Sequence, residues 1–187
     1  MNNALFKGQD ICLGPVDLEK DPAVESRWTH DADYLRAFGV LPVKQRTEAQ
    51  IKSRYQEDER AMDEKRSLFH FAIRSLEDDR LLGFVRLTWL DWTHGSARLA
   101  LGIGDPAHRR KGYGTQVLHL VLRYAFHELN LFRLTAMLPA YNLGAQQFFS
   151  RAGFTIDARR REALHRDNRR WDLLHMGLLR EEWEPTS

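Results

Sequence analysis

The chain has 187 residues, with 28 lysines and arginines against 26 aspartates and glutamates, so its formal net charge is +2. A charge this small excludes a general nucleic-acid or membrane-surface binder, and no stretch is apolar enough to predict a signal peptide or a membrane span. The length suits one domain over residues 1–187. The single cysteine, Cys12, excludes an intramolecular disulfide, and we expect a cytoplasmic protein with no membrane partner.

The hydrophobic periods alternate between helix and strand along the chain. In order, they predict a strand at 9–16, a broken helix at 21–38, a charged helix at 47–66, strands at 68–73, 81–90 and 98–103, a helix at 112–129, a strand at 132–138, a helix at 142–152, and strands near 155–162 and 170–178. This order predicts an α+β fold with a mostly antiparallel sheet and helices on both faces. Gly102 and Gly104 mark a bulge or a close backbone approach at the end of the strand at 98–103.

The helix at 47–66 carries many charges and few apolar residues. Ile51, Tyr55 and Met62 form a narrow apolar stripe, which predicts a helix that lies over the surface. Six acids and five bases nearly cancel, so we interpret the remaining face as solvated.

The segment at 105–115 joins a strand to an amphipathic helix and contains two glycines and three cations. Its cofactor-binding candidates are Arg109, Arg110, Lys111, Gly112, Tyr113, Gly114 and Thr115. The first N–H groups of a helix have no intrahelical partner and lie at the positive end of its dipole, so they can bind phosphate. The spacing Arg-x-x-Gly-x-Gly suits a pyrophosphate, whereas a basic turn with permissive glycines is the alternative.

A second segment, thirty residues further on, reads Asn142-x-x-Ala145 and ends at Gly153-Phe154. Together the two segments resemble the acetyl-CoA-binding core of the GNAT superfamily of N-acetyltransferases. The two ends of the chain resemble more loosely the branch with ribosomal-protein and polyamine acetyltransferases.

The resemblance implies an α/β/α fold with a mixed, mostly antiparallel and splayed central sheet. It also implies an enzyme that transfers acetyl directly from acetyl-CoA, as co-substrate, to a primary amine, without a metal. The pantetheine arm would lie beside Gly102, Ile103 and Gly104, and a backbone N–H near Ile103, on a bulged strand, would polarise the thioester. Asn142 would orient the CoA arm, although capping of the following helix explains it equally well.

Two positions depart from the family pattern. Phe149, also expected in the cofactor site, stands where many members carry a tyrosine that protonates the departing thiolate. Tyr113, Tyr141 and Ser150 are possible substitutes, as is departure beside water. The strand at 98–102 contains no acid, which leaves two possible bases, Asp91 and His94, that are better explained as solvent-exposed turn residues.

The acceptor is left open among a peptide N-terminus, a polyamine and another small amine, and the chain could form a homodimer. The tryptophans at 28, 89, 92 and 171 could line the acceptor site or pack in the core. Two alternatives compete with an enzyme: a CoA-binding module without catalysis, and an RNA-associated protein that uses the basic segment 157–171. That segment carries a net +3, too small to predict a nucleic-acid partner over a solvated hairpin.

Overall fold

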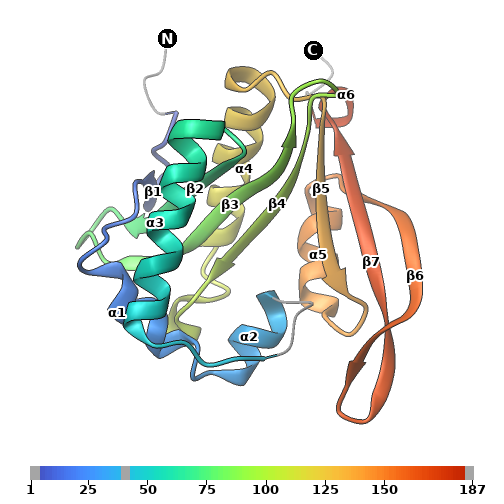
Figure 1. Cartoon of the computed structure of the whole chain (residues 1–187). Coiled ribbons are helices and arrows are strands. Elements are labelled where there is room, and N and C mark those ends of the chain that lie inside the picture. The colour runs from blue at the N-terminus through green and yellow to red at the C-terminus, as the bar shows by residue number, and fades with distance from the viewer. Residues whose placement is uncertain (1–4, 39–42, 184–187) are drawn as a thin grey trace.

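The computed structural model describes residues 5–38 and 43–183 and contains one seven-stranded sheet (Figure 1). The strands are β1 (Ile11–Gly14), β2 (Leu68–Ser75), β3 (Leu81–Asp91), β4 (Ser96–Ile103), β5 (Arg133–Pro139), β6 (Thr155–Arg166) and β7 (Arg169–Leu179). Their order in the sheet is β1-β2-β3-β4-β5-β7-β6, and every neighbouring pair is antiparallel except β4 with β5. The mixed, mostly antiparallel α+β fold is confirmed.

Helices cover both faces of the sheet. The helices are α1 (Asp21–Trp28), α2 (Ala32–Phe38), α3 (Glu48–Lys65), α4 (Tyr113–Arg123), α5 (Leu143–Arg151) and α6 (Arg180–Trp183). In Figure 1, α1 and α3 lie in front of the sheet, whereas α4 and α5 lie behind it. Each side has its own core: α4 and α5 bury the larger one, and α1, α2 and α3 bury a smaller aromatic cluster.

The helix predicted at 112–129 is confirmed, with an irregular end. Val117, Leu118, Val121 and Leu122 are at most 2% exposed, because their spacing places them on one face against the sheet. Beyond α4 the chain continues as one π-helical turn, Tyr124–Glu128, in which the N–H of Leu129 donates to the carbonyl of Tyr124. The predicted helix at 112–129 therefore ends where the sequence placed it.

The sheet divides between β4 and β5. These parallel strands pair only from Ser96 with Arg133 to Arg98 with Thr135, and the described register contains no later pair. Figure 1 shows the strands separating from that point. The expected splay is confirmed, and it leaves one edge of residues 99–103 facing a gap.

The expected bulge lies on another strand. The register of β4 with β3 is continuous from Gly83 with Ile103 to Thr88 with Arg98, and it shifts only between Thr88 and Asp91. The irregularity thus belongs to β3, where Trp89 has a positive φ of 54°. The expectation of a bulged strand near Ile103 was therefore wrong, because both strands run in register there.

The charged helix α3 makes more buried contacts than its composition indicated. It begins with a capping box between Thr47 and Gln50, and Ile51 and Tyr55 are fully buried in the smaller core. The guanidinium of Arg54 and the hydroxyl of Tyr55 both donate to the carboxylate of Glu25, which is only 6% exposed.

Asp58, one turn further along α3, makes a second buried group of contacts. It accepts from Arg86 on β3, and one of its oxygens lies 3.1 Å from Nδ1 of His70 on β2. The interpretation of this helix face as solvated was therefore wrong at Arg54 and Asp58, because each charge found a partner on a neighbouring element.

We expected no segment of this chain to span a membrane. None of the described helices combines the length and the apolar character that a membrane crossing requires.

Because the imidazole of His70 is buried, we expect the folded protein to lose stability in acid. Burial lowers the pKa of His70 to about 4, against the opposing effect of Asp58. The unfolded chain binds this proton near pH 6.5 and the folded chain only near pH 4, so stability is present above pH 6.5 and is lost as pH falls through that window. We expect His70 to account for a loss on the order of 3 kcal/mol in the free energy of unfolding.

Urea unfolding of wild type and His70→Gln at several pH values between 7 and 4 measures this loss. The variant should show a flatter dependence on pH, whereas His94→Gln, at an exposed turn, should retain the wild-type slope. Equal slopes in all three proteins would show that His70 is not the titrating group.

Candidate functional site

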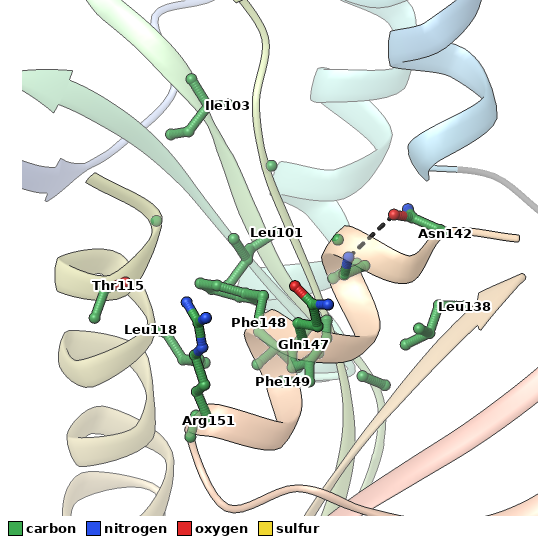
Figure 2. Close-up of a pocket in the computed structure, with 18 of the residues that line it drawn as sticks. Leu101, Ile103, Thr115, Leu118, Leu138, Asn142, Gln147, Phe148, Phe149 and Arg151 are labelled. Atoms are coloured by element: carbon green, nitrogen blue, oxygen red, sulfur yellow. Dashed lines mark hydrogen bonds between the residues drawn. The ribbon is translucent and has the colours of Figure 1, made fainter. Parts of the chain in front are cut away.

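A cavity of about 1210 Å³ occupies the gap between β4 and β5 and continues between α4 and α5 (Figure 2). Of the expected cofactor-binding residues, the cavity is lined by Gly102, Ile103, Arg109, Arg110, Gly112, Gly114, Thr115, Asn142 and Phe149. Gly104, Lys111 and Tyr113 are not among its lining residues. The structure thus brings together two segments that lie about thirty residues apart in the sequence.

The start of α4 forms one end of the cavity. Gly112 is the N-cap residue, with a φ of 86° that side chains rarely adopt, and its carbonyl accepts from Thr115 and Gln116. As the first residues of the helix, Tyr113 and Gly114 have no intrahelical acceptor for their N–H groups. The local geometry therefore suits an anion, as the motif predicted.

The guanidinium of Arg109 donates hydrogen bonds to other groups of the protein. Nε donates to the carbonyl of Ile103 at 3.1 Å, and Nη2 donates to the carbonyl of Gly104 at 2.6 Å and to Asp31 at 3.3 Å. These contacts fasten the loop before α4 to the end of β4 and to the residue that precedes α2. Arg109, which the motif predicted as a phosphate ligand, braces the loop before α4 in the structure.

Gly104 is needed for close packing against an aromatic ring. A Cβ on Gly104 would lie 2.1 Å from the indole ring of Trp28, so only glycine fits below this side chain. Of the two interpretations of the glycines here, the close approach is correct. Trp28 is 9% exposed and belongs to the core, whereas Trp89 and Trp92, at 74% and 48% exposed, lie at the distant end of β3 and its turn.

Asn142 caps α5, and its side chain reaches the cavity. Its Oδ1 accepts from the N–H of Ala145 at 3.0 Å, which Figure 2 shows as a dashed line. The capping interpretation is therefore confirmed. Because the cap occupies the carbonyl oxygen, the amide nitrogen is the part of the side chain left to orient a ligand.

Phe149 is part of an aromatic cluster at the cavity wall. It is 7% exposed, and its ring centroid lies 5.2 Å from that of Phe148 and 5.1 Å from that of Phe154. The suggested proton donors lie elsewhere: Tyr113, Tyr141 and Ser150 are absent from the described lining, and the hydroxyl of Tyr141 donates to the carbonyl of Arg36.

Asp91 and His94 do not reach the cavity. Asp91 pairs with Ser96 at the start of β4, seven residues from Ile103, which corresponds to roughly 23 Å of extended strand. Its carboxylate accepts from the N–H of His94, and both side chains are exposed. The structure therefore places them as the solvent-exposed turn residues of the alternative interpretation.

Four polar side chains that line the cavity were not predicted from the sequence as site residues: Tyr34, His119, Gln147 and Arg151. Arg151 lies at the end of α5, and its side chain extends toward α4 (Figure 2). Arg151 belonged to the second motif segment and could have been proposed from its charge. Tyr34, on α2, stands in no motif.

Comparisons with known proteins agree with this geometry. The family model described as "Acetyltransferase (GNAT) domain" matches residues 10–155. The chain is 34% identical to the probable N-acetyltransferase YjcK of Bacillus subtilis over 158 residues, which cover 80% of this chain and 83% of that protein. It is 29% identical to the putative ribosomal N-acetyltransferase YdaF of the same organism over 109 residues, 58% of this chain and 59% of that one.

Solved structures share the fold. The spermidine N-acetyltransferase from Vibrio cholerae, in complex with CoA and spermine, has a TM-score of 0.81 at 18% identity and covers 93% of this chain and 98% of its own. A probable acetyltransferase has a TM-score of 0.82 at 20% identity, with 94% and 96% covered. The fold is that of the GNAT acetyltransferases. The chain belongs to the GNAT N-acetyltransferase family, as its two motif segments predicted.

The two possible roles of Asn142 can be separated by substitution. Asn142→Ala should lower the free energy of unfolding by about 1 kcal/mol, because α5 loses its cap. Asn142→Ser keeps a capping oxygen but has no amide nitrogen, so it should retain stability and bind CoA about five-fold more weakly. Calorimetric titration and urea unfolding measure both quantities. Unchanged CoA affinity in Asn142→Ser would leave capping as the whole role.

Substitution of Gly114 tests whether the loop at the start of α4 binds the phosphates of CoA. A Cβ there would lie 3.4 Å from the ring of Phe148, in ordinary contact, so Gly114→Val should fold while its methyl groups narrow the cavity mouth. We expect at least a ten-fold loss of CoA affinity with little change in melting temperature. Gly14→Val on β1, where a Cβ meets no atom within 4 Å, is the control. Equal CoA affinity in both variants would make Gly114 a turn residue alone.

Proposed function

We propose that the enzyme transfers an acetyl group from acetyl-CoA directly to a primary amine, with a peptide N-terminus, a polyamine or another small amine as acceptor. The observation that carries this proposal is the unpaired edge of β4, which faces the start of α4 and the capped start of α5 across one cavity. A pantetheine arm has amide groups that could pair with this edge like an added strand. Its pyrophosphate would then lie at the N–H groups of Tyr113 and Gly114.

The chemistry follows from the groups on the cavity wall. Arg110 and Arg151 are exposed cations beside it, which suit the phosphates of CoA. The amine must be neutral to attack the thioester. The amine attacks the thioester carbon, the C–S bond breaks with its electron pair on sulfur, and the proton lost by nitrogen balances the one gained by sulfur.

Acetyl-CoA should stabilise the folded protein by mass action. At one hundred times its dissociation constant it adds about 2.7 kcal/mol, which raises the melting temperature by roughly 5–10 °C in a domain of this size. NAD and ATP at the same concentration should give no comparable shift. A shift with either of them but none with acetyl-CoA would contradict the assignment of the cavity.

An acceptor panel distinguishes an enzyme from a CoA-binding module. The panel contains spermidine, ethanolamine and a peptide with a free α-amino group, and CoA thiol release measures turnover. We expect amine-dependent release with one class of acceptor. Binding of acetyl-CoA without release above the rate in buffer, across the panel, would favour the binding module.

A further inference from the structure

The cavity passes through the sheet from one face to the other. Leu101 packs against the core below α4, whereas its neighbour Gly102 pairs with Phe84, which belongs to the cluster below α1 and α3. Both Leu101 and Gly102 line the cavity. On β5, Ala136 faces the α4 side and the next residue, Met137, faces the other, and both again line it. The gap between β4 and β5 therefore has an opening on the face opposite α4 and α5.

Helix α2 lies over that second opening. It packs against both β4 and β5, the two strands that separate (Figure 1). Its ends are held by two ion pairs, Asp31 with Arg109 at 3.3 Å and Arg36 with Asp167 at 2.8 Å. The position of α2 is thus tied to the phosphate loop on one side and to the β6–β7 hairpin on the other.

Tyr34 is the part of α2 that reaches the cavity. Within the described residues it is the one member of α1, α2 and α3, and the one tyrosine, that lines it. The side chain is 5% exposed, and its ring centroid lies 5.9 Å from that of Trp28, which itself packs on Gly104. A buried phenol is therefore held at the opening that faces away from α4 and α5.

The surroundings keep this phenol neutral. Burial, followed by the charge of Glu25, raises the pKa of Tyr34 above its ordinary value, although Arg54, Arg86 and Arg109 act against the shift. A phenol that ionises so reluctantly is a poor proton donor to a thiolate. It can still accept one hydrogen bond through its oxygen and donate another.

We propose that the Tyr34 hydroxyl binds the acceptor, with its oxygen accepting a hydrogen bond from the amine nitrogen while CoA occupies the α4–α5 side. This inference rests on the proposed function. As nitrogen attacks the thioester carbon it gains positive charge, so the contact strengthens toward the transition state. The N–C bond forms, the C–S bond breaks with its electrons on sulfur, and Tyr34 retains its own proton throughout.

Bisubstrate adducts test this contact without requiring turnover. In these compounds the sulfur of CoA carries an acetyl group whose carbonyl is joined to spermidine or to the N-terminus of a tripeptide. Both adducts place an amide N–H where the amine would react. We expect wild type to bind at least one adduct more tightly than CoA itself, because the acceptor portion adds contacts.

The informative variant is Tyr34→Phe, which removes the hydroxyl and keeps the ring against Trp28. It should bind CoA within two-fold of wild type. The ratio of adduct affinity to CoA affinity should fall at least five-fold, and kcat/KM for the acceptor should fall by a similar factor. Tyr124→Phe is the control, because Tyr124 packs on Phe69 and Phe71 away from the cavity lining and should behave as wild type.

The outcomes separate this inference from the proposed function. If Tyr34→Phe keeps the full adduct advantage, or loses affinity for CoA and adduct equally, the hydroxyl does not contact the acceptor although the enzyme still uses CoA. If wild type binds CoA but neither adduct more tightly, the acceptor contact is likewise overturned. Failure of wild type to bind CoA or either adduct would instead overturn the proposed function.

Discussion

The early end of pairing between β4 and β5 is the constraint around which the rest of the molecule is arranged. Three residue pairs hold the two strands together, and beyond Arg98 and Thr135 the backbone of each strand faces a gap. A buried peptide group without a hydrogen bond is costly, so a sheet keeps such a gap only where another group can fill it. The start of α4, the capped start of α5 and the side of α2 that carries Tyr34 all face this gap.

Arg109 braces the loop before α4 and so connects the two sides of this gap. The carbonyls of Ile103 and Gly104 end the β4 strand, and Arg109 satisfies both while also reaching Asp31. Trp28 packs on Gly104 from the same direction. A change in the loop on binding an anion would thus be felt at the residue that precedes α2, because one guanidinium contacts both. In the proposed mechanism the CoA side and the acceptor side share this support, although they lie on opposite faces of the sheet.

Sequence reasoning found what depends on local pattern and missed what depends on packing between distant elements. The face of α4 follows from its own spacing, and the cap at Asn142 and the start of α4 at Gly112 follow from local geometry. The likeness between two motif segments and a known family supplied the splay, which no periodicity contains. Arg54, by contrast, looked like one more charge on a solvated helix, because Glu25, its buried partner, lies on another helix.

Tyr34 was hidden for the same reason, since nothing in its own segment shows that α2 crosses the gap between two strands. The exposed tryptophan at position 89 shows the opposite error. Its size suggested a core or binding residue, but the irregularity of β3 turns it outward, over the guanidinium of Arg98 at 4.0 Å. In both cases the side chain was visible in the sequence, whereas its direction depended on tertiary structure.

The position of the Tyr34 hydroxyl bears on which of the two reacting groups, the amine or the thiolate, the protein assists. Phe149 forms part of the cavity wall on the α4–α5 side with an aromatic ring that cannot give a proton, and its packing with Phe148 and Phe154 contributes to the core. The phenol of Tyr34 lies instead at the opening on the other face, where we propose that the nucleophile binds. A thiolate is a stable leaving group compared with an alkoxide, whereas an attacking amine must be oriented and must shed a proton. Assistance on the amine side therefore acts on the step that needs it more, which makes the loss of a hydroxyl at position 149 compatible with acetyl transfer.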